Sequence, residues 1–346
     1  MICIIGNAPS AGSTFLADLL DSAPDSICGP ELNLFSNRRL YDFAYYRRHI
    51  NATSSSGSTH RLRIGLNFDR LYSYGLDRAN YIRMVRDSAD LGEFIDRFGY
   101  YYKALRGKDQ GSLLFEKTPE NINAVGDFLD AVPGGYFIHI TRNPLHIYAS
   151  LLKRGFARYV SLLTWLLDVA MVHPHRDHPR VILVKYEELV RRPFELTAEL
   201  LQHLTGHVLA PDAIETGYRN NEYRKIHSKK IATWSVREYG TIRDANAKRL
   251  PAGQLRDLAT LLNVRVRPVY AGRFRMAALS FREAIEHYGY TGDVMRELEP
   301  AGRSESLPAP GAADLRRLAI KWLLDCRNGD AGPGALSLYL RPVERA

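Results

Sequence analysis

The sequence predicts an α/β fold in which helices cover both faces of a central parallel sheet. Short apolar runs typical of buried strands fall at residues 2–5, 113–115, 136–141 and 181–185, and helical patterns lie between them. Strands and helices that alternate in this way form parallel sheets. A glycine-bearing turn also follows the first strand directly, which is where α/β proteins bind phosphate groups.

The turn from Gly6 to Thr14 has the composition of an anion-binding loop. Its glycines let backbone N–H groups point inward, and the helical run that follows offers unpaired donors and the positive end of its dipole. Two hydroxyl groups add further donors. An ordinary connection between a strand and a helix is the alternative. The residues predicted to bind phosphate are Ser10, Ala11, Gly12, Ser13 and Thr14.

The loop differs from the P-loop of nucleotide kinases. That motif places four residues between its glycines and a lysine after the second, whereas five residues separate Gly6 from Gly12 here and no lysine follows. Because the loop still joins a strand to a helix, as a P-loop does, we predict a P-loop-like three-layer fold. A nucleotide-dependent kinase or other phosphoryl transferase stays as the less favoured alternative.

A long excursion, residues 36–111, separates the first two predicted strands and is rich in tyrosine and arginine. Its tip at 51–59 is small and polar, as mobile loops are, and one helical stretch is predicted over 77–105. In a fold that binds its ligand at the sheet edge, we expect this helical insertion to form the wall for an acceptor.

The strand at 136–141 ends at Arg142, with Pro144 suited to the first turn of a helix and Ser150 eight residues after the arginine. Ligands of open α/β sheets collect at such strand ends. A guanidinium fork and a hydroxyl suit a phosphate monoester. A surface arginine and a solvent-facing serine are the alternative.

The C-terminal part contains one further helical run, 312–324, after a candidate linker at 300–311. We therefore predict a single α/β domain over residues 1–299, with residues 300–346 forming the linker and a C-terminal helix that docks on it.

Together these segments resemble the PAPS (3′-phosphoadenosine-5′-phosphosulfate)-dependent sulfotransferases. Three more blocks match the family, at 115–121, 184–193 and 288–290, and the first of them (FEKTPEN) resembles bacterial members and the tyrosylprotein sulfotransferase branch. The resemblance covers residues 1–35 and 112–290. It implies an enzyme that transfers a sulfuryl group from PAPS to a hydroxyl of a carbohydrate, lipid, peptide or secondary metabolite, releasing 3′,5′-ADP without a metal.

The resemblance also implies roles for single residues. The first loop would hold the 5′-phosphosulfate, and Arg142 and Ser150 the 3′-phosphate. Glu31 would be the general base and Lys117 would contact the transferring group, although a solvated carboxylate and a surface lysine are the plain alternatives. In the basic segment 218–249, Ser228 and Lys230 would cover the nucleotide.

One position departs from the family pattern. The loop usually carries lysine or arginine after its proline, and this chain has Ser10 there. A cation must therefore come from elsewhere, and a non-catalytic protein that binds PAPS or another polyanion stays as an alternative.

The composition of the chain bears on its ligands and on the compartment in which it works. A formal charge of +9 over 346 residues favours anionic ligands, but no nucleic-acid-binding motif is present, so we predict no nucleic-acid partner. Three scattered cysteines give no zinc spacing and suggest a reducing compartment.

The first strand leaves no room for a cleavable signal and no apolar run is long enough for a membrane span, so we expect a cytoplasmic protein. The histidines at 173, 175 and 178 read as a loop, and His139 as an interior residue. The oligomeric state stays open.

Overall fold

The computed structural model describes residues 1–50, 71–109, 111, 113–221, 250–267, 277–302, 307–328, 340 and 342–345. The chain divides into two compact units. Unit 1 comprises residues 1–7, 12–141 and 178–245, and unit 2 comprises residues 8–11, 142–177 and 246–346.

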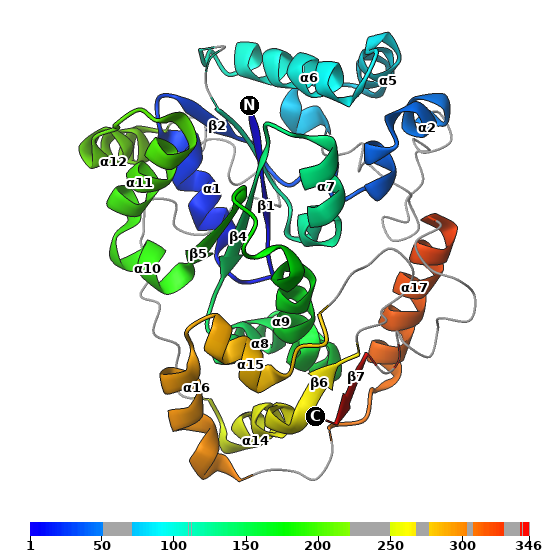
Figure 1. Ribbon diagram of the computed structural model, residues 1–346, viewed down its shortest axis with the longest axis vertical. Coiled ribbons are helices and arrows are strands. Elements are labelled where there is room, and N and C mark those ends of the chain that lie inside the picture. The colour runs from blue at the N-terminus through cyan, green and yellow to red at the C-terminus, as the bar shows by residue number, and fades with distance from the viewer. Residues whose placement is uncertain are drawn as a thin grey trace. The chain divides into compact units, whose positions relative to one another are not determined.

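Unit 1 is built on a parallel sheet of five strands in the order β2-β3-β1-β4-β5 (Figure 1). The strands are β1 (Ile2–Gly6), β2 (Ser26–Cys28), β3 (Leu113–Lys117), β4 (Tyr136–Thr141) and β5 (Val181–Lys185). All four strands predicted from the sequence are confirmed, and β2 is an addition. In this register Ile5 lies beside Lys117, and Gly6 beside His139. The carboxyl ends of β1, β3 and β4 therefore meet at one edge of the sheet.

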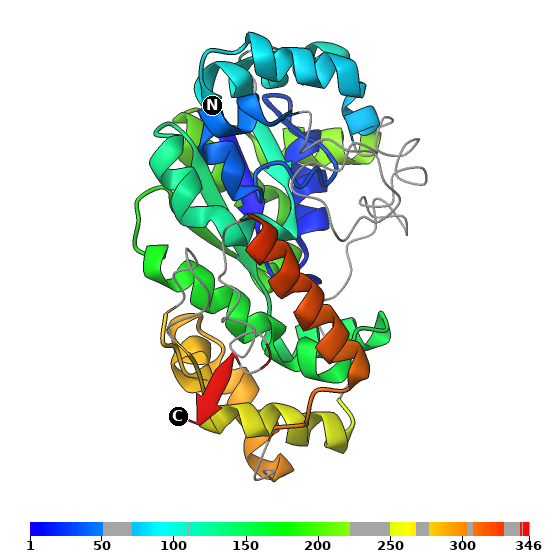
Figure 2. The ribbon, with the colours of Figure 1, turned by 90° about the vertical axis from the view of Figure 1, so that its right-hand side faces the viewer.

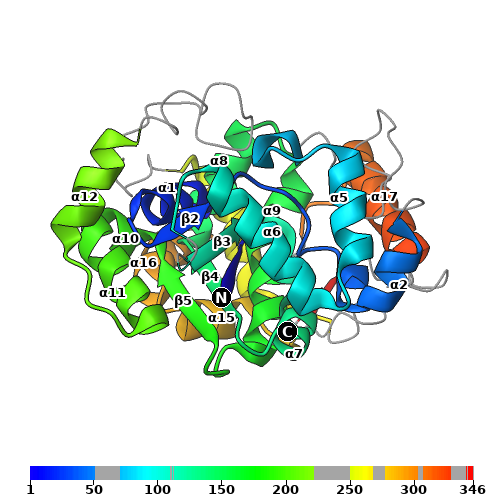
Figure 3. The ribbon, with the colours of Figure 1, turned by 90° about the horizontal axis from the view of Figure 1, so that it is seen from above.

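Helices cover both faces of this sheet, so the predicted fold class is confirmed (Figure 3). On one face lie α1 (Ser13–Ser22), α10 (Tyr186–Arg191), α11 (Pro193–Thr205) and α12 (Pro211–Asn220). Their apolar side chains form one buried cluster with Cys3, Ile5 and Phe115 of the strands. On the other face lie α6 (Leu91–Leu105) and α7 (Val125–Ala131), and the 3-10 turn η3 (Pro119–Ala124) packs on β1.

The insertion consists of η1 (Arg38–Tyr41), α2 (Phe43–Arg48), η2 (Tyr72–Tyr74), α5 (Arg78–Asp87) and α6. The prediction of a single helical stretch over 77–105 is wrong, because the helix is interrupted between α5 and α6. Asp90 caps α6 by accepting the Glu93 N–H at 2.8 Å, and the Glu93 carboxylate accepts the Ala89 N–H at 2.6 Å. This reciprocal pair starts a new helix. The predicted polar tip at 51–59 lies outside the described residues.

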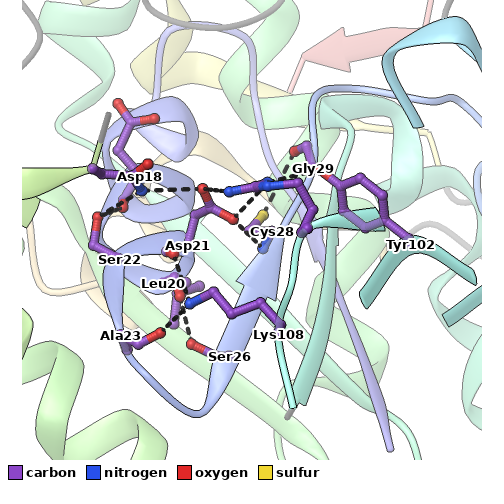
Figure 4. A network of polar contacts seen from close by, with 12 residues as sticks. Asp18, Leu20, Asp21, Ser22, Ala23, Ser26, Cys28, Gly29, Tyr102 and Lys108 are labelled. Atoms are coloured by element: carbon purple, nitrogen blue, oxygen red, sulfur yellow. Dashed lines mark hydrogen bonds and ion pairs between the residues drawn. The ribbon is translucent and has the colours of Figure 1, made fainter. Parts of the chain in front are cut away.

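A buried ion pair fixes the C-terminal end of α1 (Figure 4). The side chains of Asp21 and Arg106 are 0% and 4% exposed and lie 3.0 Å apart. Asp21 also accepts the Cys28 N–H at 3.0 Å and an amide N–H of Asn221 at 3.2 Å, and Lys108 donates to the Ala23 carbonyl at 2.7 Å. The far end of α1 is thereby held to β2, to the end of α6 and to the residue after α12.

Unit 2 is mainly helical. Its helices are α8 (Pro144–Lys153), α9 (Arg158–Val172), α14 (Ala252–Thr260), α15 (Phe281–His287), α16 (Thr291–Leu298) and α17 (Ala312–Asn328), with short 3-10 turns η4 (His173–His175), η5 (Leu261–Asn263) and η6 (Glu299–Ala301). A two-stranded antiparallel pair, β6 (Val264–Val266) and β7 (Val343–Arg345), joins distant parts of the chain. Trp165 of α9 makes edge contacts with the rings of Phe281, Tyr288 and Tyr290, which places the 288–290 block in this core.

The helix predicted near the C-terminus is present as α17, orange-red in Figure 2, and extends to Asn328. It packs against α9, where the Asp314 carboxylate accepts the Val160 N–H at 2.9 Å. Among the described residues, no helix combines the length and apolarity needed to cross a membrane.

Candidate active site

The loop after β1 is shaped by two glycines in close contact with neighbouring elements. A Cβ on Gly6 would lie 2.6 Å from the Ile122 nitrogen and 2.7 Å from the Phe137 ring. Gly12 has φ +99°, and a Cβ there would lie 2.1 Å from the ring of Tyr186, the first residue of α10. The block around Tyr186 matches the family pattern, which gives this residue no role. The structure shows that its ring packs on the glycine that begins α1.

The start of α1 keeps its backbone donors open. Gly12 is the N-cap without a side-chain hydrogen bond, and no acidic residue stands in the first turn. The carbonyl of Gly12 accepts the N–H groups of Phe15 and Leu16 at 3.0 and 3.3 Å. Within the described part of the chain, the N–H groups of Gly12, Ser13 and Thr14 have no hydrogen-bond acceptor. A helix start of this kind suits an anion.

A cation and a carboxylate meet at this helix start. Lys117 is the last residue of β3 and its side chain is completely buried, while that of Glu31 is 21% exposed. Lys117 Nζ lies 2.7 Å from Glu31 Oε1 and 3.4 Å from the hydroxyl of Thr14. The structure therefore brings together three residues that were predicted separately. A partly exposed carboxylate and a buried ammonium group side by side can accept a proton and balance negative charge.

A buried carboxylate, that of Glu116, positions Glu31. Glu116 Oε1 accepts the Leu32 N–H at 3.0 Å and the Thr118 hydroxyl at 2.6 Å, and Oε2 accepts the Asn121 amide at 2.7 Å. The Thr118 hydroxyl oxygen also accepts the Leu32 and Asn33 N–H groups at 3.2 and 3.1 Å. Burial raises the pKa of Glu116, although these hydrogen bonds oppose the shift. The FEKTPEN block thus fixes the backbone that follows Glu31, a role that the sequence analysis did not assign.

In unit 2, two arginines contact Ser10. Asn143 caps α8 by accepting the Leu145 N–H at 2.9 Å, which places Arg142 just before the helix as predicted. Arg142 Nη1 donates to the Ser10 carbonyl oxygen at 3.4 Å. Arg154, the residue after α8, donates from Nη1 to the Ser10 hydroxyl at 2.9 Å. Arg154 was missed, although it follows Ser150 by four residues and so shares its side of the helix.

His139 is an interior histidine, as predicted. It is 1% exposed, and its ring Nδ1–H donates to the Gly6 carbonyl at 3.2 Å. Burial lowers its pKa from 6.5 to about 4. The ring is therefore neutral at physiological pH and supports the end of β1.

Of the other predicted site residues, Ala11 and Ser13 are buried and Ser150 is half-buried. Ser228 and Lys230 lie outside the described residues. In the part of the chain that the structure describes, no three His, Cys, Asp or Glu side chains gather closely enough to hold a metal ion. His173 contacts the ring of His287, with 4.8 Å between ring centroids.

Comparison with known proteins gives one clear match. A family model described as "Sulfotransferase family" matches residues 2–207, which is more than half of the 346 residues. The matched range contains the loop after β1, Glu31, Lys117, Arg142 and Ser150. A search of curated proteins finds no match.

Several solved structures are distantly similar. The sulfotransferase domain of the Synechococcus PCC 7002 olefin synthase is 16% identical, with 72% of this chain and 88% of that chain covered and a TM-score of 0.45. The sulfotransferase domain from the curacin biosynthetic pathway is 17% identical, with 63% and 77% covered and a TM-score of 0.44. Sulfotransferase STF9 from Mycobacterium avium is 16% identical, with 65% and 68% covered and a TM-score of 0.35.

Proposed function

We propose that this chain, which belongs to the sulfotransferase family, transfers the sulfuryl group of PAPS to a hydroxyl group of an acceptor. The family predicted from the sequence, and with it the prediction of an enzyme, is confirmed by the family match. The main support for sulfuryl transfer from PAPS is the Lys117–Glu31 ion pair beside the Thr14 hydroxyl, at the start of α1.

The donor set around the loop fits an anionic nucleotide. The open N–H groups of Gly12, Ser13 and Thr14 and the hydroxyl groups of Ser13 and Thr14 suit the 5′-phosphosulfate. Arg142 and Ser150 remain our proposal for the 3′-phosphate, because a planar guanidinium pairs well with phosphate oxygens. When bound, PAPS supplies the sulfuryl group and, as 3′,5′-ADP, the leaving group.

Glu31 and Lys117 divide the proton and charge chemistry in this proposal. The acceptor oxygen forms a bond to sulfur while its proton passes to the Glu31 carboxylate, and the bond from sulfur to the leaving phosphate oxygen breaks. Lys117 Nζ, at the Thr14 hydroxyl, balances the negative charge that develops on the leaving side. The buried network of Glu116, Thr118 and Asn121 holds Glu31 in place for this step.

The insertion stays our proposal for the acceptor wall. The Tyr74 hydroxyl donates to the Pro30 carbonyl at 2.6 Å, so η2 of the insertion contacts the residue directly before Glu31. The acceptor class, whether carbohydrate, lipid, peptide or secondary metabolite, is open, and the roles of Ser228 and Lys230 stay predictions.

A thermal-shift panel with 3′,5′-ADP, 5′-AMP and ATP with Mg²⁺ tests the proposal. A ligand at about a hundred times its Kd adds about 2.7 kcal/mol of stability. Selective stabilisation by 3′,5′-ADP is expected, and preference for ATP with Mg²⁺ would instead support a phosphoryl transferase. Release of 3′,5′-ADP from PAPS that depends on an added acceptor then separates an enzyme from a non-catalytic binding protein.

A further inference from the structure

We infer that Arg154 supplies the cation that the loop itself lacks, and that its guanidinium group binds the 5′-phosphate side of the nucleotide. The inference rests on the proposed function, since it assigns one more residue to the same cofactor. It follows from the contact between Arg154 Nη1 and the Ser10 hydroxyl at 2.9 Å.

Two contacts orient the Arg154 side chain. Besides the hydrogen bond to Ser10, its guanidinium carbon lies 5.1 Å from the centroid of the Phe156 ring. Cations are attracted to aromatic faces at this distance. Ser10 itself has φ +74°, an unusual conformation for a residue other than glycine, and its hydroxyl and carbonyl oxygens both accept from arginine. Ser10 therefore contacts two guanidinium groups.

Two positively charged side chains contact Ser10. Arg142 donates to the Ser10 carbonyl at 3.4 Å, so two cations approach one small residue and repel each other. No carboxylate in the described part of the chain pairs with Arg154. Arg158 in the same unit shows the contrast, because Asp257 accepts hydrogen bonds from both its Nε and an Nη. Arg158 has a structural partner, whereas an anion would relieve the charge at Arg154.

The position of Arg154 points to the 5′ side. Both arginines contact Ser10, a loop residue that the proposed function assigns to the 5′-phosphosulfate. Arg142 donates to its backbone carbonyl, whereas Arg154 donates to its side-chain hydroxyl. Arg142 and Ser150 already account for the 3′-phosphate in that proposal. Because the guanidinium group is exposed, it can move from the hydroxyl to a phosphate oxygen without losing buried contacts.

Calorimetric titration of the full chain with 5′-AMP, 3′-AMP and 3′,5′-ADP at low ionic strength tests the inference. We expect Arg154→Gln to weaken 5′-AMP and 3′,5′-ADP about tenfold or more, on the scale of one lost charged hydrogen bond, and to leave 3′-AMP unchanged. Lys153→Gln is the matched control, because it removes the same charge from the neighbouring exposed position and should leave all three affinities within about twofold.

The titration results separate a failure of the Arg154 assignment from a failure of the proposed function. Equal affinities for wild type and Arg154→Gln, or a loss confined to 3′-AMP, would overturn the role of Arg154 while leaving the proposed function intact. A wild-type chain that does not bind 3′,5′-ADP would overturn both. Recovery of 5′-AMP binding by Ser10→Lys in the Arg154→Gln background would support the inference, since it returns a cation to the loop. An unchanged melting temperature for Arg154→Gln shows that the variant is folded.

Discussion

Replacing Glu31 by glutamine separates its chemistry from its contacts. The amide oxygen of the new side chain can still accept the hydrogen bond that Lys117 Nζ makes at 2.7 Å, so the loop after β2 should keep its shape. The proton acceptor is gone. We therefore expect turnover to fall by about 10² to 10⁴, or about 3 to 5 kcal/mol of transition-state stabilisation, with 3′,5′-ADP affinity nearly unchanged.

The same variant should be less stable than the wild type. The Lys117 side chain is completely buried and loses the charge opposite it. Breaking a buried ion pair from one side costs about 3 to 5 kcal/mol, and we expect about 1 to 3 kcal/mol here because 21% of the Glu31 side chain is exposed to water. Adding Lys117→Met removes the isolated ammonium group, and should restore part of the stability and none of the activity.

Single-turnover release of 3′,5′-ADP from PAPS, with an acceptor found by screening, measures the fall in turnover. Urea unfolding measures the loss of stability. Glu188→Gln is the control, because it removes an exposed carboxylate from the same unit. Turnover of Glu31→Gln close to that of the wild type would refute the assignment of the base.

Four further variants test other parts of the structure. Arg142→Ala should weaken 3′,5′-ADP by about 1.5 to 3 kcal/mol per lost hydrogen bond and leave 5′-AMP nearly unchanged in calorimetry; equal losses would reject the 3′-phosphate role. Lys117→Ala should lower kcat about 10² to 10³ while 3′,5′-ADP still binds, and unchanged single-turnover rates would show that charge is balanced elsewhere. Arg106→Met should cost about 3 to 5 kcal/mol in urea unfolding, because Asp21 stays buried without its partner; a loss under about 1 kcal/mol would argue against a charged Asp21. Because the pKa of His139 falls from 6.5 to about 4 on folding, the unfolded chain binds a proton that the folded chain does not, and stability should drop by about 3 kcal/mol as the pH falls through this range; His139→Gln should lack that drop in denaturation midpoints measured against pH.

The strands that the sequence predicted are those with mainly apolar runs. The run at 136–141 became a buried strand, and the proline at 144 marked the next helix start. β2 was missed because it has only three residues, Ser26–Cys28, and pairs with a strand far along the chain. The pairing of β6 with β7 is equally long-range. The interruption before α6, in contrast, could have been predicted from local sequence, because Asp90 and Glu93 have capping-box spacing and signal a helix start.

The candidate site was predictable in its residue types more than in its contacts. Glu31 and Lys117 were each singled out, but their ion pair depends on the pairing of β1 with β3 and on the path of the chain after β2. Nothing local in the sequence specifies that geometry. The contact of Arg154 with Ser10 joins residues that are 144 positions apart, so no sequence spacing could have indicated it.

The close packing of Gly12 against Tyr186 has a consequence for the evolution of the chain. Any side chain at position 12 would occupy the space of the tyrosine ring, since even a Cβ would lie 2.1 Å from it. The two positions are therefore expected to change together: among homologues, a residue larger than glycine at position 12 should occur only with a smaller one than tyrosine at position 186. An alignment of many relatives would show this as covariation between two segments that are far apart in sequence.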